Sequence, residues 1–216
     1  TNHSNEPHAY IPPERSFEAT GMSQEKRRTL GLTAVLGGLG GAAVAVPFVS
    51  TFTPSEKAKA AGAPVEVDLS EIAPGNMKVV EWRGKPVWIL RRTPEMLESI
   101  EGHDDELVDP ESEQFYQDKT PEYAKNHARA IRPEYLVVVG ICSHLGCSPS
   151  NRFAEGAQPS LPADWPGGWL CPCHGSTFDL SGRVFKNKPA NKNLDVPPYM
   201  FLSDSTILVG ADESAA

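Results

Sequence analysis

All four cysteines of this chain fall into two short boxes, and these boxes constrain the fold more than any other feature. The first box reads CSHLGC, from Cys142 to Cys147, and the second reads CPCHGS, from Cys171 to Ser176. The chain has 216 residues and no other cysteine. Such clustering indicates one metal or redox site rather than scattered core thiols. The fold must therefore bring the two loops together.

Each box offers a thiolate and an imidazole as metal ligands. The first pair is Cys142 and His144, and the second is Cys171 and His174. Two sulfurs can bind one iron and two nitrogens a second iron, which is the ligand set of a Rieske 2Fe-2S cluster. A structural zinc site and two disulfides without metal are the alternatives. The zinc alternative leaves two cysteines and the apolar span described next without a role.

An apolar span near the N-terminus predicts a transmembrane helix. From Thr29 to Ser55 the chain has 27 consecutive residues without a charge. About 20 apolar residues suffice for a helix to cross the hydrocarbon core of a bilayer. Five glycines in this span would weaken a helix in water, but they let helices approach closely in lipid. We therefore predict one transmembrane helix over residues 29–52.

The charges next to this span predict its orientation. Lys26, Arg27 and Arg28 precede it directly, so the positive-inside rule places the tail of residues 1–28 in the cytoplasm and the rest outside. The Arg27-Arg28 pair also resembles a twin-arginine export signal. The alternative is a cleaved signal peptide with its small-x-small site at residues 58–60. We expect the span to be retained as an anchor.

The remaining chain divides into a linker and a β-rich head. Residues 53–64 are small or charged and predict a flexible hinge, because Gly62 and Pro64 block a continuous helix. Residues 65–216 predict an antiparallel β-sandwich, in which a partly helical insertion at 93–134 interrupts the strands. We expect strands at Val65–Leu69, Met77–Trp82, Lys85–Arg91, Tyr135–Ile141, Gly168–Cys171 and Thr206–Gly210.

Acidic residues dominate the charge of the chain. The formal net charge is −8, which argues against nucleic acid as a partner. Eleven acidic residues lie between Glu95 and Glu122, where Lys119 is the only base. We expect these side chains to form a solvated face of the insertion. A docking patch for a basic partner is the alternative.

The boxes, the span and the linker together resemble the Rieske subunits of quinol–cytochrome c reductases, over nearly everything after residue 22. The resemblance implies an all-β Rieske head with a cluster-binding subdomain at about 140–192. It also implies an electron-transfer subunit of a respiratory cytochrome bc complex in a bacterial inner membrane, with the head in the periplasm. The expected partners are a cytochrome b subunit, a c-type cytochrome subunit, quinol and the membrane, within a dimeric complex.

Other Rieske proteins match less well. Soluble ferredoxins and oxygenase subunits lack the two additional cysteines and the apolar span. The small subunit of arsenite oxidase is exported and can keep a disulfide, but the long insertion and a retained span argue against it. The plastoquinol-oxidising relative shares both boxes, yet its head lacks such an insertion. We therefore expect the respiratory complex.

The resemblance also implies a role for each ligand. Cys142 and Cys171 would bind the inner iron, and His144 and His174 the exposed iron. Two neutral imidazoles in place of thiolates make a cluster easier to reduce, with potentials of roughly −150 to +300 mV against about −400 mV for plant-type ferredoxins. Because a metal on one ring nitrogen lowers the pKa of the other, either exposed histidine would accept a proton from quinol. The head would then move towards the c-type haem.

By the same resemblance, the two remaining cysteines, Cys147 and Cys173, form a disulfide that ties the loops together. Such a bond requires an oxidising compartment, which agrees with the predicted orientation. The resemblance also implies that Leu145 shields the tip of the cluster.

Three further positions are expected to surround the cluster. The hydroxyl of Ser176 would donate to a bridging sulfide. Pro189 lies in a loop that covers the cluster, but Asn191 replaces the second proline usual in that loop, so its rigidity is in question. Phe178 stands where relatives often carry a tyrosine that donates to a ligand sulfur. A phenylalanine cannot donate, which predicts a lower potential.

Overall fold

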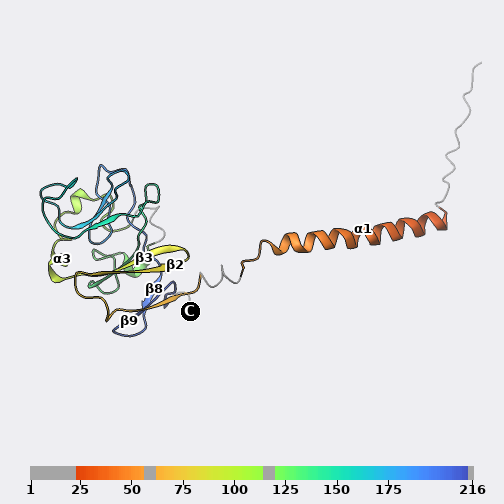
Figure 1. Cartoon of the computed structure of the whole chain (residues 1–216), viewed down its shortest axis with the longest axis horizontal. Helices are drawn as coiled ribbons and strands as arrows, with labels where there is room; N and C mark the ends of the chain where they lie inside the picture. The colour runs from red at the N-terminus through yellow and green to blue at the C-terminus, as the bar shows by residue number, and fades with distance from the viewer. Residues whose placement is uncertain (1–22, 56–61, 114–119, 214–216) are drawn as a thin grey trace, which may run out of the picture. The chain divides into compact units, whose positions relative to one another are not determined.

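The chain forms two compact units, each described here by itself (Figure 1). The computed structural model describes residues 23–55, 62–113 and 120–213. One unit ends at Pro54, and the other begins at Ser55. The tail of residues 1–22, the cleavage site at 58–60 and the centre of the hinge lie outside the described residues, so those predictions stay predictions.

Helix α1 forms the first unit. It runs from Gln24 to Ser50 and begins at an N-cap, where the Ser23 hydroxyl accepts a hydrogen bond from the backbone N–H of Lys26. The helix therefore begins five residues before the start of the predicted span, and it ends two residues before the end of that span. None of its residues is buried, and its most apolar window has a mean hydropathy of 1.9. By length and composition α1 can cross a membrane, which is consistent with an anchor.

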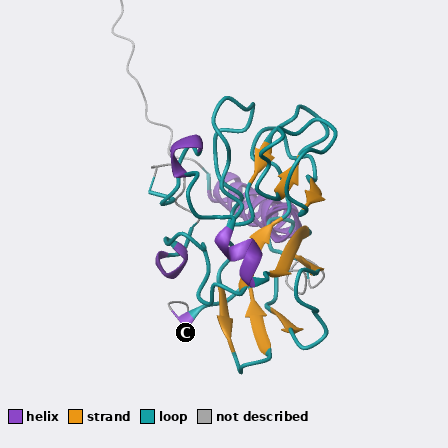
Figure 2. Ribbon diagram, turned by 90° about the vertical axis from the view of Figure 1, so that its left-hand side faces the viewer, coloured by secondary structure: helices purple, strands orange, loops and turns teal. Residues whose placement is uncertain are grey.

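The described residues of the head form three small antiparallel sheets of three strands each, and Figure 2 shows the strands among long loops. Their orders are β1-β9-β8, β2-β3-β4 and β5-β6-β7. The strands are β1 (Val65–Asp68), β2 (Met77–Trp82), β3 (Lys85–Arg91), β4 (Tyr135–Val139), β5 (Ser150–Arg152), β6 (Gly168–Leu170), β7 (Thr177–Phe178), β8 (Tyr199–Phe201) and β9 (Thr206–Val209).

All six predicted strands are present, and their ends differ from the predicted ends by at most two residues. The prediction missed β5, β7 and β8, which have only two or three residues and therefore show no alternation of apolar and polar side chains. The insertion is partly helical, as expected. Its described helices are α3 (Pro94–Glu98), η1 (Asp104–Glu106) and η3 (Glu122–Ala124).

The core lies around β3 and β4. Most side chains on both faces of these two strands are buried. Every residue of β4 is buried. The Trp88 ring of β3 stacks on Trp169 of β6 at 5.5 Å between ring centroids, so two sheets share this contact. Gly140 follows β4, where a Cβ atom would lie 2.1 Å from the Trp88 ring. Glycine is required there because the backbone that leads into the first box passes directly over the indole.

The insertion is anchored in the head by buried arginines. Arg92, Arg129 and Arg183 are each at most 2% exposed. Arg183 forms ion pairs with buried Asp179 and half-buried Asp104, at 2.7 Å and 2.9 Å. Burial alone would raise the pKa of Asp179, but hydrogen bonds from His103 and Arg183 hold it below its usual range. The acidic side chains of the insertion are mostly exposed, as predicted, whereas its basic anchors were not predicted.

Candidate metal centre

The two boxes form two loops of the same construction. The first loop connects β4 to β5, and the second connects β6 to β7. In the first, the N–H of Gly146 donates to the carbonyl of Cys142 at 3.0 Å. In the second, the N–H of Gly175 donates to the carbonyl of Cys171 at 2.9 Å. Both glycines have φ near +80°, the left-handed region that glycine adopts without strain.

A second hydrogen bond closes each loop at its base. The N–H of Cys142 donates to the carbonyl of Cys147 at 2.8 Å, and the N–H of Cys171 donates to the carbonyl of Ser176 at 2.7 Å. The backbone of the leading cysteine is therefore held from both sides. Both leading cysteines are free thiols and only 2% exposed. The loops present two buried sulfurs to the same interior.

A disulfide joins the two loops, as predicted. It connects Cys147 with Cys173, with a Cα–Cα distance of 6.7 Å. The bond links positions 26 residues apart in the chain. Since neither loop has regular secondary structure, this covalent link and the closing hydrogen bonds fix their relative position.

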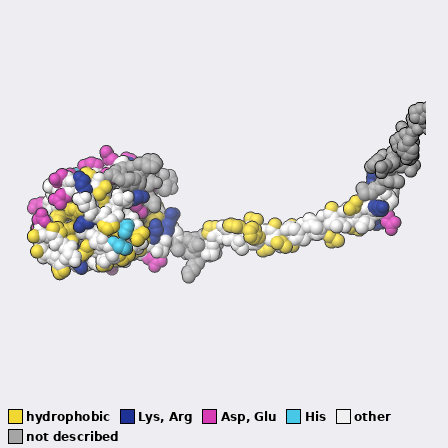
Figure 3. Space-filling model, turned by 90° about the horizontal axis from the view of Figure 1, so that it is seen from above, with side chains coloured by type: hydrophobic (Ala, Val, Ile, Leu, Met, Phe, Trp, Pro, Cys, Tyr) yellow, Lys and Arg dark blue, Asp and Glu magenta, His cyan; other side chains and the backbone are white. Residues whose placement is uncertain are grey.

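The two imidazoles meet at the outer end of the loops. The ring centroids of His144 and His174 lie 4.8 Å apart, with an angle of 89° between the ring planes. His144 is half-buried and His174 is exposed. Histidine side chains form a patch on one face of the head, apart from most of the acidic side chains on that face (Figure 3). The site thus has sulfur inside and nitrogen outside.

The environment of the inner sulfurs opposes an isolated thiolate. Burial raises the pKa of the Cys142 thiol, and the adjacent Cys171 raises it further. The backbone N–H of His144 and the hydroxyl of Ser176 act in the opposite direction, because both favour a negative sulfur. A bound cation would supply the missing stabilisation. Binding a metal here would therefore release protons from these thiols.

The remaining predicted residues lie around these loops. Leu145 is 70% exposed and follows His144 in the first loop. Ser176 is fully buried and accepts a hydrogen bond at 3.0 Å from the N–H of Ala190. Phe178 is also fully buried, in the same hydrophobic cluster as Cys142. No described contact joins its ring to a cysteine sulfur, so its predicted position stays a prediction.

The segment of residues 188–194 touches both loops. A loop around Pro189 was expected to cover the cluster, and that role stays a prediction. Pro189 is exposed, while Ala190 is buried against Ser176. The Ser143 hydroxyl donates to the carbonyl of Lys192 at 2.6 Å, a contact that the sequence did not reveal.

This donor set fits a 2Fe-2S cluster with two sulfur and two nitrogen ligands. Two free thiols are buried together, two imidazoles face each other, and the remaining cysteines are consumed by the disulfide. A four-coordinate zinc site would match the donor count but not their separation into an inner sulfur pair and an outer nitrogen pair.

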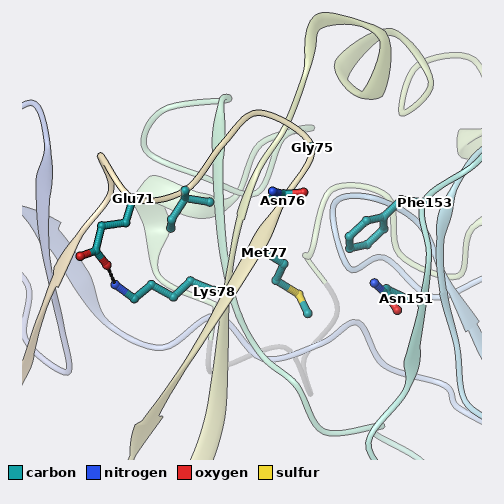
Figure 4. Close-up of a pocket in the computed structure, with 8 residues that line it drawn as sticks. Glu71, Gly75, Asn76, Met77, Lys78, Asn151 and Phe153 are labelled. Carbon is teal, nitrogen blue, oxygen red and sulfur yellow. Dashed lines mark hydrogen bonds and ion pairs between the residues drawn. The ribbon is translucent and has the colours of Figure 1, made fainter.

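Two other features lie outside this centre. An open cavity of about 560 Å³ lies between β2 and β5, and none of its lining residues belongs to either box (Figure 4). Lys78 forms an ion pair with Glu71 at its edge. On the insertion, His127 lies close to Asp104 and Glu111.

Comparison with known proteins identifies the family. Residues 64–199 match the family model described as "Rieske [2Fe-2S] domain". The chain is 51% identical to the "Ubiquinol-cytochrome c reductase iron-sulfur subunit" of Allochromatium vinosum, across 93% of this chain and 95% of that one. This chain belongs to the family of Rieske iron–sulfur subunits. The subunit from Blastochloris viridis is 42% identical, across 83% of this chain and 88% of its own.

A solved structure also matches this Rieske subunit. A chain of a structure described as "Hyperthermophilic respiratory Complex III" is 26% identical and covers 83% of this chain and 98% of its own length, with a TM-score of 0.42. Membership of this family confirms the predicted resemblance to Rieske subunits and the predicted 2Fe-2S cofactor. Rieske proteins transfer electrons one at a time, and this chain is such a protein.

The first prediction tests the nitrogen ligands. Replacing His144 or His174 by glutamine should abolish the Rieske-type electron paramagnetic resonance signal, because an amide is a poor ligand for the outer iron. His127→Gln is a matched control, since that histidine is bound to the insertion rather than to the loops. A normal signal in either ligand variant would refute the assignment.

The second prediction tests the bridge between the loops. Cys147→Ser should lower the temperature at which the cluster is lost, because the disulfide no longer holds the two loops together. In the wild-type chain, denatured without reductant after removal of the cluster, a thiol assay should find two free thiols. A count of four would show that the disulfide does not form.

Proposed function

We propose that this chain is the Rieske subunit of a cytochrome bc1 complex and passes electrons from quinol to a c-type cytochrome. The observation that carries this proposal is the asymmetry of the centre. Its sulfur donors are buried in the head, while its two imidazoles reach the surface beside an exposed apolar side chain, Leu145. The identity of 51% to a ubiquinol–cytochrome c reductase subunit over almost the whole chain supports the same role.

The proposed ligands are Cys142 and Cys171 for the inner iron, and His144 and His174 for the outer iron. When bound, the cluster accepts and releases one electron and lowers the pKa of its imidazole ligands. The ring nitrogen of His174 or His144 that does not hold iron would, in its deprotonated form, accept the proton of the quinol hydroxyl and later release it to water. Leu145 excludes water from the contact between the histidines and quinol.

The proposed location follows from the helix and the disulfide. Lys26, Arg27 and Arg28 lie at the beginning of α1, so the positive-inside rule keeps this end in the cytoplasm of a bacterium. The disulfide between Cys147 and Cys173 requires an oxidising compartment, which supports a periplasmic location of the head. The partners in the membrane are a cytochrome b subunit, which binds quinol, and a c-type cytochrome subunit, within a dimeric complex.

The third prediction tests movement of the head. One tether at residues 53–64 has to let the head reach two partners in turn, so a stiffer tether should slow turnover. Gly62→Pro combined with Ala63→Pro should lower quinol–cytochrome c reductase activity several-fold, while the resonance signal and midpoint potential stay unchanged. The matched control is Gly62→Ala. Unchanged turnover in the proline variant would contradict a moving head.

The fourth prediction concerns the potential. A hydrogen bond to a ligand sulfur stabilises the more negative, reduced cluster and thus raises its midpoint potential. One hydrogen bond to a charged group is worth at most about 1.5–3 kcal/mol, and 59 mV corresponds to about 1.4 kcal/mol for one electron. Phe178→Tyr should therefore raise the potential by some tens of millivolts, as measured by redox titration.

Phe153→Tyr is the control for this change. Phe153 packs edge-on against Trp169 in the same subdomain and lines the cavity of Figure 4, so a hydroxyl there should leave the potential unchanged. If Phe178→Tyr leaves the midpoint unchanged or lowers it, the ring at position 178 does not face the cysteine sulfur.

A further inference from the structure

Arg129 of the insertion is fully buried and uses all five of its N–H donors. Two acceptors belong to the insertion itself, and three belong to the part of the head that follows β7. The acceptors are the hydroxyls of Ser112 and Thr120 and the carbonyls of Ser181, Gly182 and Leu194, at 2.8 Å to 3.3 Å. One side chain therefore joins two regions that are distant in the sequence.

The backbone around this side chain is strained. Arg129 has φ of 49° and Ser112 has φ of 58°, the left-handed region that side chains disfavour. Such residues persist only where the surrounding contacts fix them. A hydrogen bond joins the side chains of these two strained residues, since Nε of Arg129 donates to the Ser112 hydroxyl at 2.9 Å. The hydrogen bonds of Arg129 therefore hold the backbone of the insertion in a conformation that is unfavourable at these two residues.

Asn193 supplies a second connection to the insertion. Its amide donates to the carbonyl of Asp109 at 2.8 Å and to the Ser112 hydroxyl at 3.1 Å. Its side-chain oxygen accepts from the N–H of Val184 at 2.9 Å. Asn193 is fully buried, and it directly precedes Leu194, whose carbonyl Arg129 binds. The insertion thus forms hydrogen bonds with two adjacent residues at the end of the 188–194 segment, Asn193 and Leu194.

The other end of this segment holds the cluster loops. The N–H of Ala190 donates to the Ser176 hydroxyl, so the hydroxyl hydrogen remains for a different acceptor. Ser176 also closes the second loop, because its carbonyl accepts from the N–H of the ligand Cys171 at 2.7 Å. The Lys192 carbonyl accepts from Ser143 of the first box. Only two residues lie between Ala190 and Asn193, so a shift of one end moves the other.

The sequence of the segment makes this anchoring necessary. Pro189 is the one proline of the segment and lies exposed at its beginning, while Asn191 is also exposed and does not restrict the backbone. Hydrogen bonds to the insertion supply this restriction at the other end of the segment. Arg183 cannot do the same, because its donors reach Asp179, Asp104 and the carbonyl of Ile100 rather than the segment.

We propose that Arg129 is a positioning residue for the cluster. It fastens the 188–194 segment to the insertion, and through Ala190 it aims the Ser176 hydroxyl at the sulfurs of the centre. The insertion then helps to set the reduction potential without contributing a ligand. This inference rests on the proposed ligand set but not on quinol as the substrate.

The test compares Arg129→Lys in two backgrounds of the full chain within its purified complex. In the wild-type background, Arg129→Lys should lower the equilibrium constant for reduction of the cluster about fivefold, which is about 40 mV at 59 mV per tenfold change. In the Ser176→Ala background, the same change should alter it less than twofold. Redox titration of the resonance signal measures both.

Hydrogen exchange supplies a readout that does not need the cluster potential. The peptide containing Ala190 should exchange faster in Arg129→Lys, while peptides of β3 and β4 keep their protection. Arg132→Lys is the matched control, because Arg132 lies in the same insertion but forms a half-exposed ion pair with Asp204. It should change neither exchange nor potential.

Thr120→Val is the second variant in case Arg129→Lys fails to fold. It removes one acceptor of Arg129 with little change of shape, and it should shift the potential in the same direction by a smaller amount. An equal shift in both Ser176 backgrounds would overturn the proposal, as would faster exchange at Ala190 without any shift. Absence of a Rieske signal in the wild-type complex would instead refute the proposed ligand set.

Discussion

The disulfide between Cys147 and Cys173 holds together two loops that have no regular secondary structure of their own. The geometry of the centre depends on this link, together with the hydrogen bonds that close each loop. The free thiols of Cys142 and Cys171 lie buried inside the head, while the rings of His144 and His174 meet edge to face at the outer end of the loops. A centre with sulfur inside and nitrogen outside can receive an electron and a proton at the same surface, because one ring nitrogen of an imidazole can bind the metal while the other acts as the base.

The rest of the head supports these loops in two ways. The sheets supply the core: β4 is buried on both faces and leads directly into the first box through Gly140. Buried arginines connect the insertion to the rest of the head, and the guanidinium groups of Arg92 and Arg129 donate mainly to backbone carbonyls rather than to acids. Since a buried cation without partners is very costly, these hydrogen bonds keep the turn after β7 and the 188–194 segment in one arrangement.

The long, chemically marked features could be predicted from the sequence. The 27 uncharged residues predicted the helix, the alternating β-rich runs predicted six strands, and the paired boxes predicted the centre. The short strands β5, β7 and β8 carry no periodic signal. The buried role of Arg129 could not be predicted either, because arginine is rarely buried and its partners are mostly backbone atoms from distant residues. The partners of Ser143 and Ser176 likewise depend on tertiary contacts.

The central claim is that the cysteines bind one iron and the histidines the other. The most direct test is pulsed electron–nuclear double resonance on the reduced complex, with ¹⁵N introduced only in histidine. The account predicts two strongly coupled histidine nitrogens in the reduced cluster of the wild-type complex. A single coupled nitrogen in the wild-type complex, or none, would contradict it.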